Sequence, residues 1–134
     1  MTAECRIFSV EEAERTLPLV RRIVDDLHLA HERWAGAIRA LDGDAAPPGS
    51  RESAEAAVQA CAAEVQAHLD ELTALGCVFK GFEGGLVDFY SLREDRLVFL
   101  CWRRGEPGIG HWHELDAGFA GRQPIDDNLF TETP

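Results

Sequence analysis

The segment from Leu100 to Gln123 holds most of the side chains in this sequence that can do chemistry. Its 24 residues include two of the three tryptophans, two of the five histidines, three arginines and five glycines. Aromatic side chains supply contact area for a ligand, and glycines let the backbone approach it closely. An irregular lid held over a core has the same composition. We place the candidate site in this segment and ask which elements position it.

Two histidines of the segment have the spacing of a metal chelate. On an extended backbone, residues i and i+2 point to the same face, so His111 and His113 can both bind one divalent transition metal. We select Asp116 as the third ligand, with Glu114 and Cys101 as alternatives. This spacing is common by chance, however, and hydrogen-bonded histidines in an aromatic loop are the more frequent explanation.

Several charged residues of the segment suit an anion. The guanidinium groups of Arg103 and Arg122 match the paired oxygens of a carboxylate or phosphate. Together with Trp102 and Glu106 they form a candidate binding site for a small anionic ligand. The alternative is an internal salt-bridge network that holds the loop, which is the interpretation we favour for the charged set.

The same region also suggests a catalytic alternative. In a small hydrolase or lyase, His113 would act as base, with Glu114 or Asp116 as its acidic partner and Arg122 holding an anionic substrate. The sequence nominates no substrate, so whether the protein is an enzyme stays open.

Two long helices are expected to precede the segment. Ser9 and Glu12 form a capping box, which predicts a helix start near Val10, and Pro18 predicts a kink early in that helix. Apolar positions then alternate in steps of three and four, as in a heptad seam. They are Leu17, Val20, Val24, Leu27, His31, Trp34, Ile38 and Leu41.

A second seam of the same period follows a turn-rich connection over residues 42–50. It consists of Ala54, Val58, Cys61, Val65, His68, Leu72 and Leu75. Gly76 then supplies a helix stop. Two seams joined by a short linker predict an antiparallel helical hairpin.

After Gly76 the pattern changes to short β-branched and aromatic runs over residues 77–80, 85–92 and 96–102. They predict an antiparallel sheet of about three strands. The glycines from Gly105 to Gly121 disfavour a long regular element there, and the acidic tail is expected to be loose. The predicted fold is therefore α+β, a long antiparallel helical hairpin packed on a small antiparallel β-sheet with a Gly-rich C-terminal loop. We expect one domain over residues 1–134, with the hairpin at about 10–76, strands and loop at about 77–123 and the tail at 124–134.

The net charge, the apolar runs and the cysteine spacing limit the partners and the location that we expect for this protein. A net charge of −11 disfavours nucleic acid and anionic membrane surfaces, since both are bound through lysine and arginine. We find no signal peptide and no run of membrane-spanning length, so we expect a cytoplasmic protein. Cys5, Cys61, Cys77 and Cys101 are widely spaced and are expected to be reduced.

Several short motifs lie along nearly the whole chain. They are Phe8-Ser-Val-Glu-Glu-Ala13 with Leu17-Pro18, Gly85-Leu-Val-Asp-Phe89, Leu100-Cys-Trp-Arg103, Gly105-Glu106, Trp112-His113 and Gly118-Phe-Ala-Gly-Arg-Gln-Pro124. In these motifs the sequence resembles a family of small bacterial proteins catalogued as domain of unknown function 2203. The resemblance implies no reaction. It implies Trp112 and His113, but often tyrosine in place of His111, which disfavours a His111 and His113 chelate as the purpose of the family.

Our leading hypothesis is a ligand- or metal-binding module centred on the C-terminal segment, without enzymatic activity. A small hydrolase or lyase is the first alternative, and a protein-interaction module that docks through the helical hairpin is the second. The exposed ends of such a hairpin also favour self-association, so we expect a homodimer.

Overall fold

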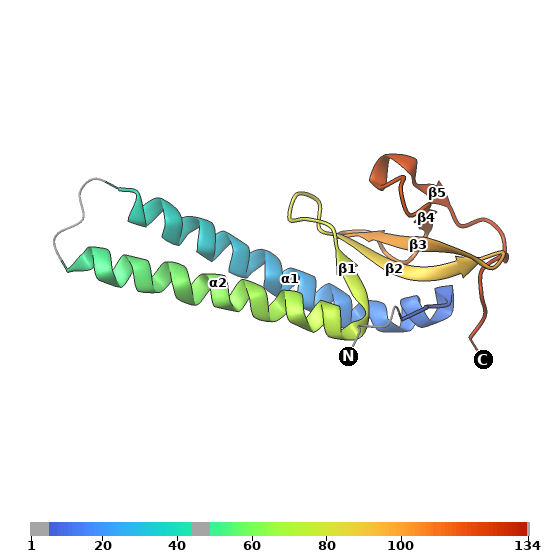
Figure 1. Ribbon diagram of the computed structural model, residues 1–134, viewed down its shortest axis with the longest axis horizontal. Coiled ribbons are helices and arrows are strands. Elements are labelled where there is room, and N and C mark those ends of the chain that lie inside the picture. The colour runs from blue at the N-terminus through green and yellow to red at the C-terminus, as the bar shows by residue number, and fades with distance from the viewer. Residues whose placement is uncertain (1–5, 44–48, 134) are drawn as a thin grey trace.

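The computed structural model describes residues 6–43 and 49–133 and has the predicted α+β architecture. Two helices, α1 (Val10–Leu41) and α2 (Ser50–Leu75), form an antiparallel hairpin that runs along one side of a five-stranded sheet and extends well beyond it (Figure 1). Cys5 lies outside the described residues. No helix within the described ranges is long and apolar enough to cross a membrane.

The helix ends follow local sequence signals. The Ser9 hydroxyl accepts a hydrogen bond from the Glu12 N–H, and the Glu12 carboxylate accepts one from the Ser9 N–H, both at 3.0 Å. The predicted capping box is therefore confirmed. α1 continues through Pro18 as one helix of 32 residues. α2 ends at Gly76, whose φ of 91° gives the left-handed cap that the glycine predicted.

The sheet is antiparallel, and its strands follow one another in chain order. They are β1 (Cys77–Phe79), β2 (Leu86–Arg93), β3 (Arg96–Arg103), β4 (His111–His113) and β5 (Gln123–Pro124). The expectation of about three strands was too low. β4 and β5 were missed because they have three and two residues, and pairing with their neighbours defines them rather than their own composition.

One face of the sheet packs on α1 and forms the core. Strand residues Val87, Phe89, Leu100 and Trp102 belong to the same buried cluster as the first half of the α1 seam. Trp102 and Trp112 are both buried, at 1% and 5% exposure. The core is thus built where helix and sheet overlap.

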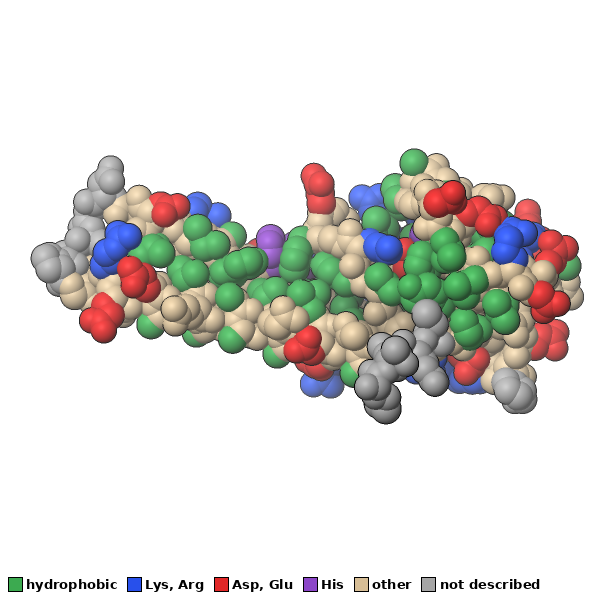
Figure 2. Space-filling model, in the orientation of Figure 1, with side chains coloured by type: hydrophobic (Ala, Val, Ile, Leu, Met, Phe, Trp, Pro, Cys, Tyr) green, Lys and Arg blue, Asp and Glu red, His purple; other side chains and the backbone are tan. Residues whose placement is uncertain are grey.

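The apolar seam residues of α1 are less buried where the hairpin extends past the sheet. Ala30 is the last fully buried residue of α1, and Ile38 is 37% exposed. Apolar side chains are visible along this part of the hairpin in Figure 2. His31, a seam residue, stacks on Phe82 of the β1–β2 loop, with ring centroids 3.8 Å apart.

The C-terminal tail is packed, contrary to expectation. The Thr131 N–H donates to the Leu92 carbonyl at 2.8 Å, and the Leu129 carbonyl accepts from Glu94 at 3.0 Å. Phe130 is 7% exposed and meets Trp112 edge to face. The polar composition of the tail gave no indication of these backbone bonds or of the packing of Phe130 and Ile125 against the core.

Candidate functional site

The face of the sheet turned away from α1 carries a row of polar residues. Asp88 on β2 pairs with Cys101 on β3, and Cys101 pairs with His111 on β4. Directly paired residues of an antiparallel sheet share a face, and His113 follows His111 by two positions on the same face. The short helix η1 (Phe119–Gly121) lies over this face, opposite α1 (Figure 1).

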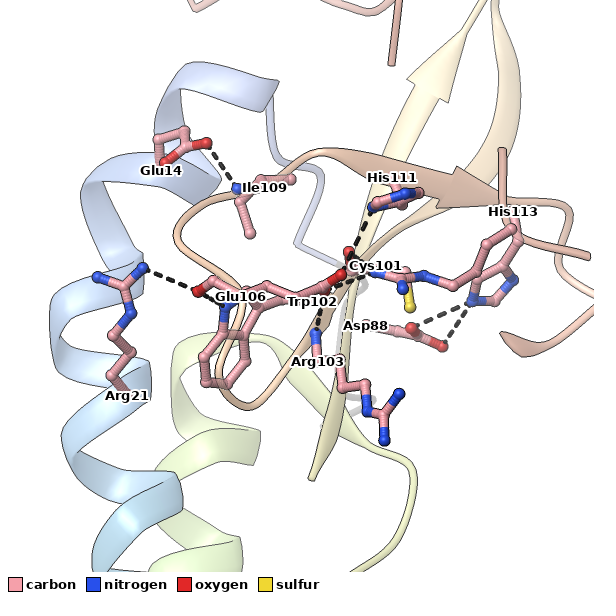
Figure 3. Close-up of polar contacts among 11 residues, drawn as sticks. Glu14, Arg21, Asp88, Cys101, Trp102, Arg103, Glu106, Ile109, His111 and His113 are labelled. Carbon is pink, nitrogen blue, oxygen red and sulfur yellow. Dashed lines mark hydrogen bonds and ion pairs between the residues drawn. The ribbon is translucent and has the colours of Figure 1, made fainter. Parts of the chain in front are cut away.

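Asp88 and His113 form a buried pair at the centre of the row. The Nε2 atom of His113 lies 3.1 Å from each carboxylate oxygen of Asp88 (Figure 3). Their exposed fractions are 1% for Asp88 and 2% for His113. Taking two such groups out of water is costly, so the pair needs either a strong mutual interaction or a further charged partner.

The other ring nitrogen of His113 is fixed by the backbone. Nδ1 lies 2.7 Å from the Glu114 carbonyl oxygen, which can only accept a hydrogen bond. Nδ1 therefore carries a proton and donates. Nε2 then meets the carboxylate of Asp88 either through a second ring proton or through a cation held between them. Metal-binding histidines are commonly oriented by such a bond from the other nitrogen.

Cys101 completes a group of three potential metal ligands. Its sulfur, a carboxylate oxygen of Asp88 and a ring nitrogen of His113 all lie within 4.8 Å of one another. Burial raises the pKa of the Cys101 thiol to about 12, and the negative charge of Asp88 adds to this effect. In the part of the chain that the structure describes, this is the one such group.

A cavity of about 250 Å³ opens beside these three side chains. Its polar wall consists of Asp88, Cys101 and His113, and its other walls come from Lys80, Leu86, Leu115, Gly118 and Phe119. The Lys80 ammonium lies 4.0 Å from Asp88 Oδ2 and 5.0 Å from the centre of the Phe99 ring. The three side chains are thus almost fully buried and border the cavity.

A second polar cluster lies next to the first and is internally paired. The Glu106 carboxylate accepts hydrogen bonds from Arg122 Nη2 and from the Arg103 N–H, both at 2.6 Å. His111 Nδ1 lies 3.7 Å from its other oxygen. Partial burial opposes ionisation of Glu106, but the bonds from Arg122 and Arg103 lower its pKa below the usual value. The cluster therefore has the form of a salt-bridge network.

Backbone contacts join this network to α1. The Glu106 carbonyl accepts from Trp102 Nε1 at 3.0 Å and from Arg21 at 3.2 Å. The Glu14 carboxylate accepts from the Ile109 N–H at 2.6 Å (Figure 3). Helix α1 thus fixes the β3–β4 loop, and the loop fixes Glu106.

The structure separates the site residues that the sequence suggested. His113 lies in the buried group with Cys101, whereas His111 faces Glu106. Asp116 is exposed and lies outside the group. The Glu114 carboxylate is paired with Arg96 through bonds of 3.0 and 2.7 Å.

The suggested anion ligands are also separated. Trp102 belongs to the core, the Arg122 side chain is only 11% exposed, and Arg103 lies over the Phe119 ring.

Sequence reasoning missed Asp88 and Lys80. Asp88 is a lone carboxylate inside the apolar run of β2, and such a residue signals a buried charge with a partner elsewhere. Lys80 is the only lysine of the chain. Its position gave no signal, because the loop that brings it to the cavity is defined only in three dimensions.

Comparison with known proteins places the chain in a family but assigns it no activity. A family model described as "Uncharacterized conserved protein (DUF2203)" matches residues 6–125, so the chain belongs to this family, as its motifs suggested. No curated protein and no solved structure matches it.

Proposed function

Since membership of this family assigns no reaction, we propose from the geometry that the protein binds one divalent transition metal ion through Asp88, Cys101 and His113. The single observation that carries the proposal is the orientation of His113, whose Nδ1 is held by a carbonyl while Nε2 points at Asp88. Three ligands on neighbouring strands of a rigid sheet are held in place before the metal arrives.

Zinc fits this set of ligands best. A thiolate, an imidazole and a carboxylate are all ligands that zinc accepts, and softer or harder metals match only part of the set. A tetrahedral zinc ion with bonds of about 2.0 to 2.3 Å holds its ligand atoms roughly 3.3 to 3.6 Å apart. The 3.1 Å between His113 Nε2 and Asp88 is close to that separation.

The site has an open position. Structural zinc sites have four protein ligands, whereas sites that act on ligands have three and leave the fourth position free. Asp88, Cys101 and His113 all line the cavity, so a metal held by these three side chains would have its fourth position on the cavity side. A reducing compartment such as the cytoplasm, where we expect this protein, keeps the Cys101 thiol available as a ligand. The proposal is therefore a metal-dependent ligand-binding module.

A hydrolase or lyase that uses His113 as base is less well supported. Both ring nitrogens of His113 are engaged, one with Glu114 and one with Asp88, so neither is directed at a substrate. The two acidic partners that the sequence suggested lie outside the buried group.

The test is the metal content of untagged protein purified without chelators. We expect about one zinc ion per chain in the wild type and loss of it in His113→Asn and Asp88→Asn. His111→Asn and His68→Asn are matched controls that should keep the metal, since both histidines lie outside the group. Zinc at 100 times its dissociation constant should stabilise the wild type by about 2.7 kcal/mol.

Two results would contradict the proposal. One is a wild-type protein with no stoichiometric metal and no thermal shift with zinc, cobalt or nickel. The other is equal metal content in His113→Asn and His111→Asn. Near-ultraviolet circular dichroism of each variant distinguishes loss of the metal from loss of the fold.

We also propose that the protein forms a homodimer through the outer half of the hairpin. The supporting observation is that the α1 seam continues past Ala30 with apolar residues that are only partly covered, such as Ile38. Sedimentation equilibrium should give a dimer for the wild type and a monomer for Ile38→Lys. A monomeric wild type at high concentration would exclude this proposal.

A further inference from the structure

The charges around the proposed metal site are unbalanced on the cavity side. A divalent ion together with its ligands, the Asp88 carboxylate, the Cys101 thiolate and neutral His113, has no net charge. Lys80, whose ammonium lies 4.0 Å from Asp88 Oδ2, then loses its partner to the metal. One positive charge is left at the cavity wall, close to the open position of the metal.

The remaining walls of the cavity are largely apolar. Leu86, Leu115 and the Phe119 ring line it, and Gly118 leaves room beside them. Leu115 and Phe119 are 45% and 44% exposed, which is high for large apolar side chains. A volume of about 250 Å³ lies below the usual range for drug-sized ligands, so the occupant is small.

We infer that the cavity binds a small monocarboxylate with an apolar body. Its carboxylate occupies the fourth position of the metal and pairs with Lys80, and its apolar part contacts Leu115 and Phe119. This inference rests on the proposed metal site and adds the class of ligand. It differs from the anion site expected from the sequence, because Arg122 is already paired with Glu106.

The experiment uses the full chain loaded with cobalt, whose visible absorption reports a change in the metal's ligands. The probes are benzoate, acetate and the neutral analogue benzamide. We expect benzoate to change the spectrum and to bind more tightly than acetate, because only benzoate fills the apolar part of the cavity. Benzamide should have no effect at the same concentrations.

Two variants test the role of the charge. Lys80→Met keeps an unbranched side chain but removes the ammonium, and it should weaken benzoate binding about tenfold or more, since bonds to charged groups are strong. Arg15→Met removes a positive charge from an exposed site on α1 and should leave benzoate binding unchanged. Cobalt stoichiometry should be the same in both variants.

The single lysine offers a second measurement. Lysine labelled with ¹³C gives one side-chain resonance set from this chain, so its shift on adding benzoate reports Lys80 directly. A wild type that takes up cobalt but shows no spectral change with benzoate, or a Lys80→Met protein with unchanged affinity, overturns the ligand assignment alone. A wild type that takes up no cobalt overturns the metal site and the ligand assignment together.

Discussion

Replacing Glu106 with glutamine tests whether the cluster around Arg122 is a structural network or a binding pocket. The substitution keeps the shape of the side chain and one oxygen acceptor but removes the charge. Two bonds of 2.6 Å, from Arg122 and from the Arg103 N–H, end on the same carboxylate oxygen and are strengthened by its charge. Hydrogen bonds to charged groups contribute about 1.5 to 3 kcal/mol each when intact.

Partial exposure reduces the expected loss. The Glu106 side chain is 23% exposed, so solvent screens part of the interaction, whereas the partner Arg122 is only 11% exposed and is left without a counter-charge. We expect Glu106→Gln to lower the free energy of unfolding by about 2 kcal/mol at neutral pH. For a chain of this length the melting temperature should fall by roughly 6 to 8 °C.

The assay is urea unfolding followed by tryptophan fluorescence, with Glu11→Gln as control. Glu11 forms an exposed pair with Arg15, so its replacement should cost less than about 1 kcal/mol. If Glu106→Gln is as stable as the wild type or more stable, the network interpretation is wrong. Residues of a binding site commonly reduce stability, and their replacement then raises it.

The contribution of Glu106 to the free energy of unfolding should decrease at acidic pH. In the folded protein the Glu106 pKa lies below its usual value of 4.5, because the bonds from Arg122 and Arg103 outweigh the effect of burial. A group with a lowered folded pKa stabilises the protein above its unfolded pKa and loses that contribution as the pH falls through the folded pKa. The difference between wild type and Glu106→Gln should therefore be constant above about pH 5 and shrink below pH 4.5.

Three further predictions concern the scaffold. Ser9→Ala should lower the free energy of unfolding by about 1 to 2 kcal/mol in urea denaturation, because the N-terminus of α1 loses its capping bond; an unchanged midpoint would contradict this. Gly76→Ala should lower the free energy of unfolding by about 1 to 3 kcal/mol, since φ is 91° and a Cβ would lie 2.8 Å from the Arg6 side chain. In the control Gly110→Ala the added Cβ meets no atom within 4 Å, so its free energy of unfolding should be nearly that of the wild type. Iodoacetamide at pH 8 should label partly exposed Cys61 and leave Cys77 unmodified, because burial raises the Cys77 pKa to about 12, and equal labelling in peptide mapping would refute it.

The helices could be predicted from the sequence because their signals are local. The capping box at Ser9 and Glu12 acts within one turn, and Gly76 ends α2 through its own backbone angle. β4 is different, because its three residues form a strand only by pairing with Phe99, Leu100 and Cys101. No property of residues 111–113 distinguishes this strand from a loop until β3 is in place.

In the candidate site, too, some residues could be selected from local sequence, whereas others depend on the pairing of distant strands. His113 could be selected because histidine is rare and the spacing to His111 is local, and Cys101 was one of the alternative ligands. Asp88 could not be paired with them, because its distance from His113 depends on the register of β2, β3 and β4, with Asp88 opposite Cys101 and Phe99 opposite His113. A slip of one residue in either pairing turns the side chain to the core face and removes the ligand. The β2–β3 hairpin fixes this register through its turn at Glu94 and Asp95, both with positive φ. Phe89 and Leu100 support it from the core side, because both are fully buried and a slip of one residue would turn one of them to the opposite face. The same alternation that places Phe89 and Leu100 on α1 therefore places Asp88 and Cys101 on the opposite face, so the packing of the core determines the geometry of the proposed metal site.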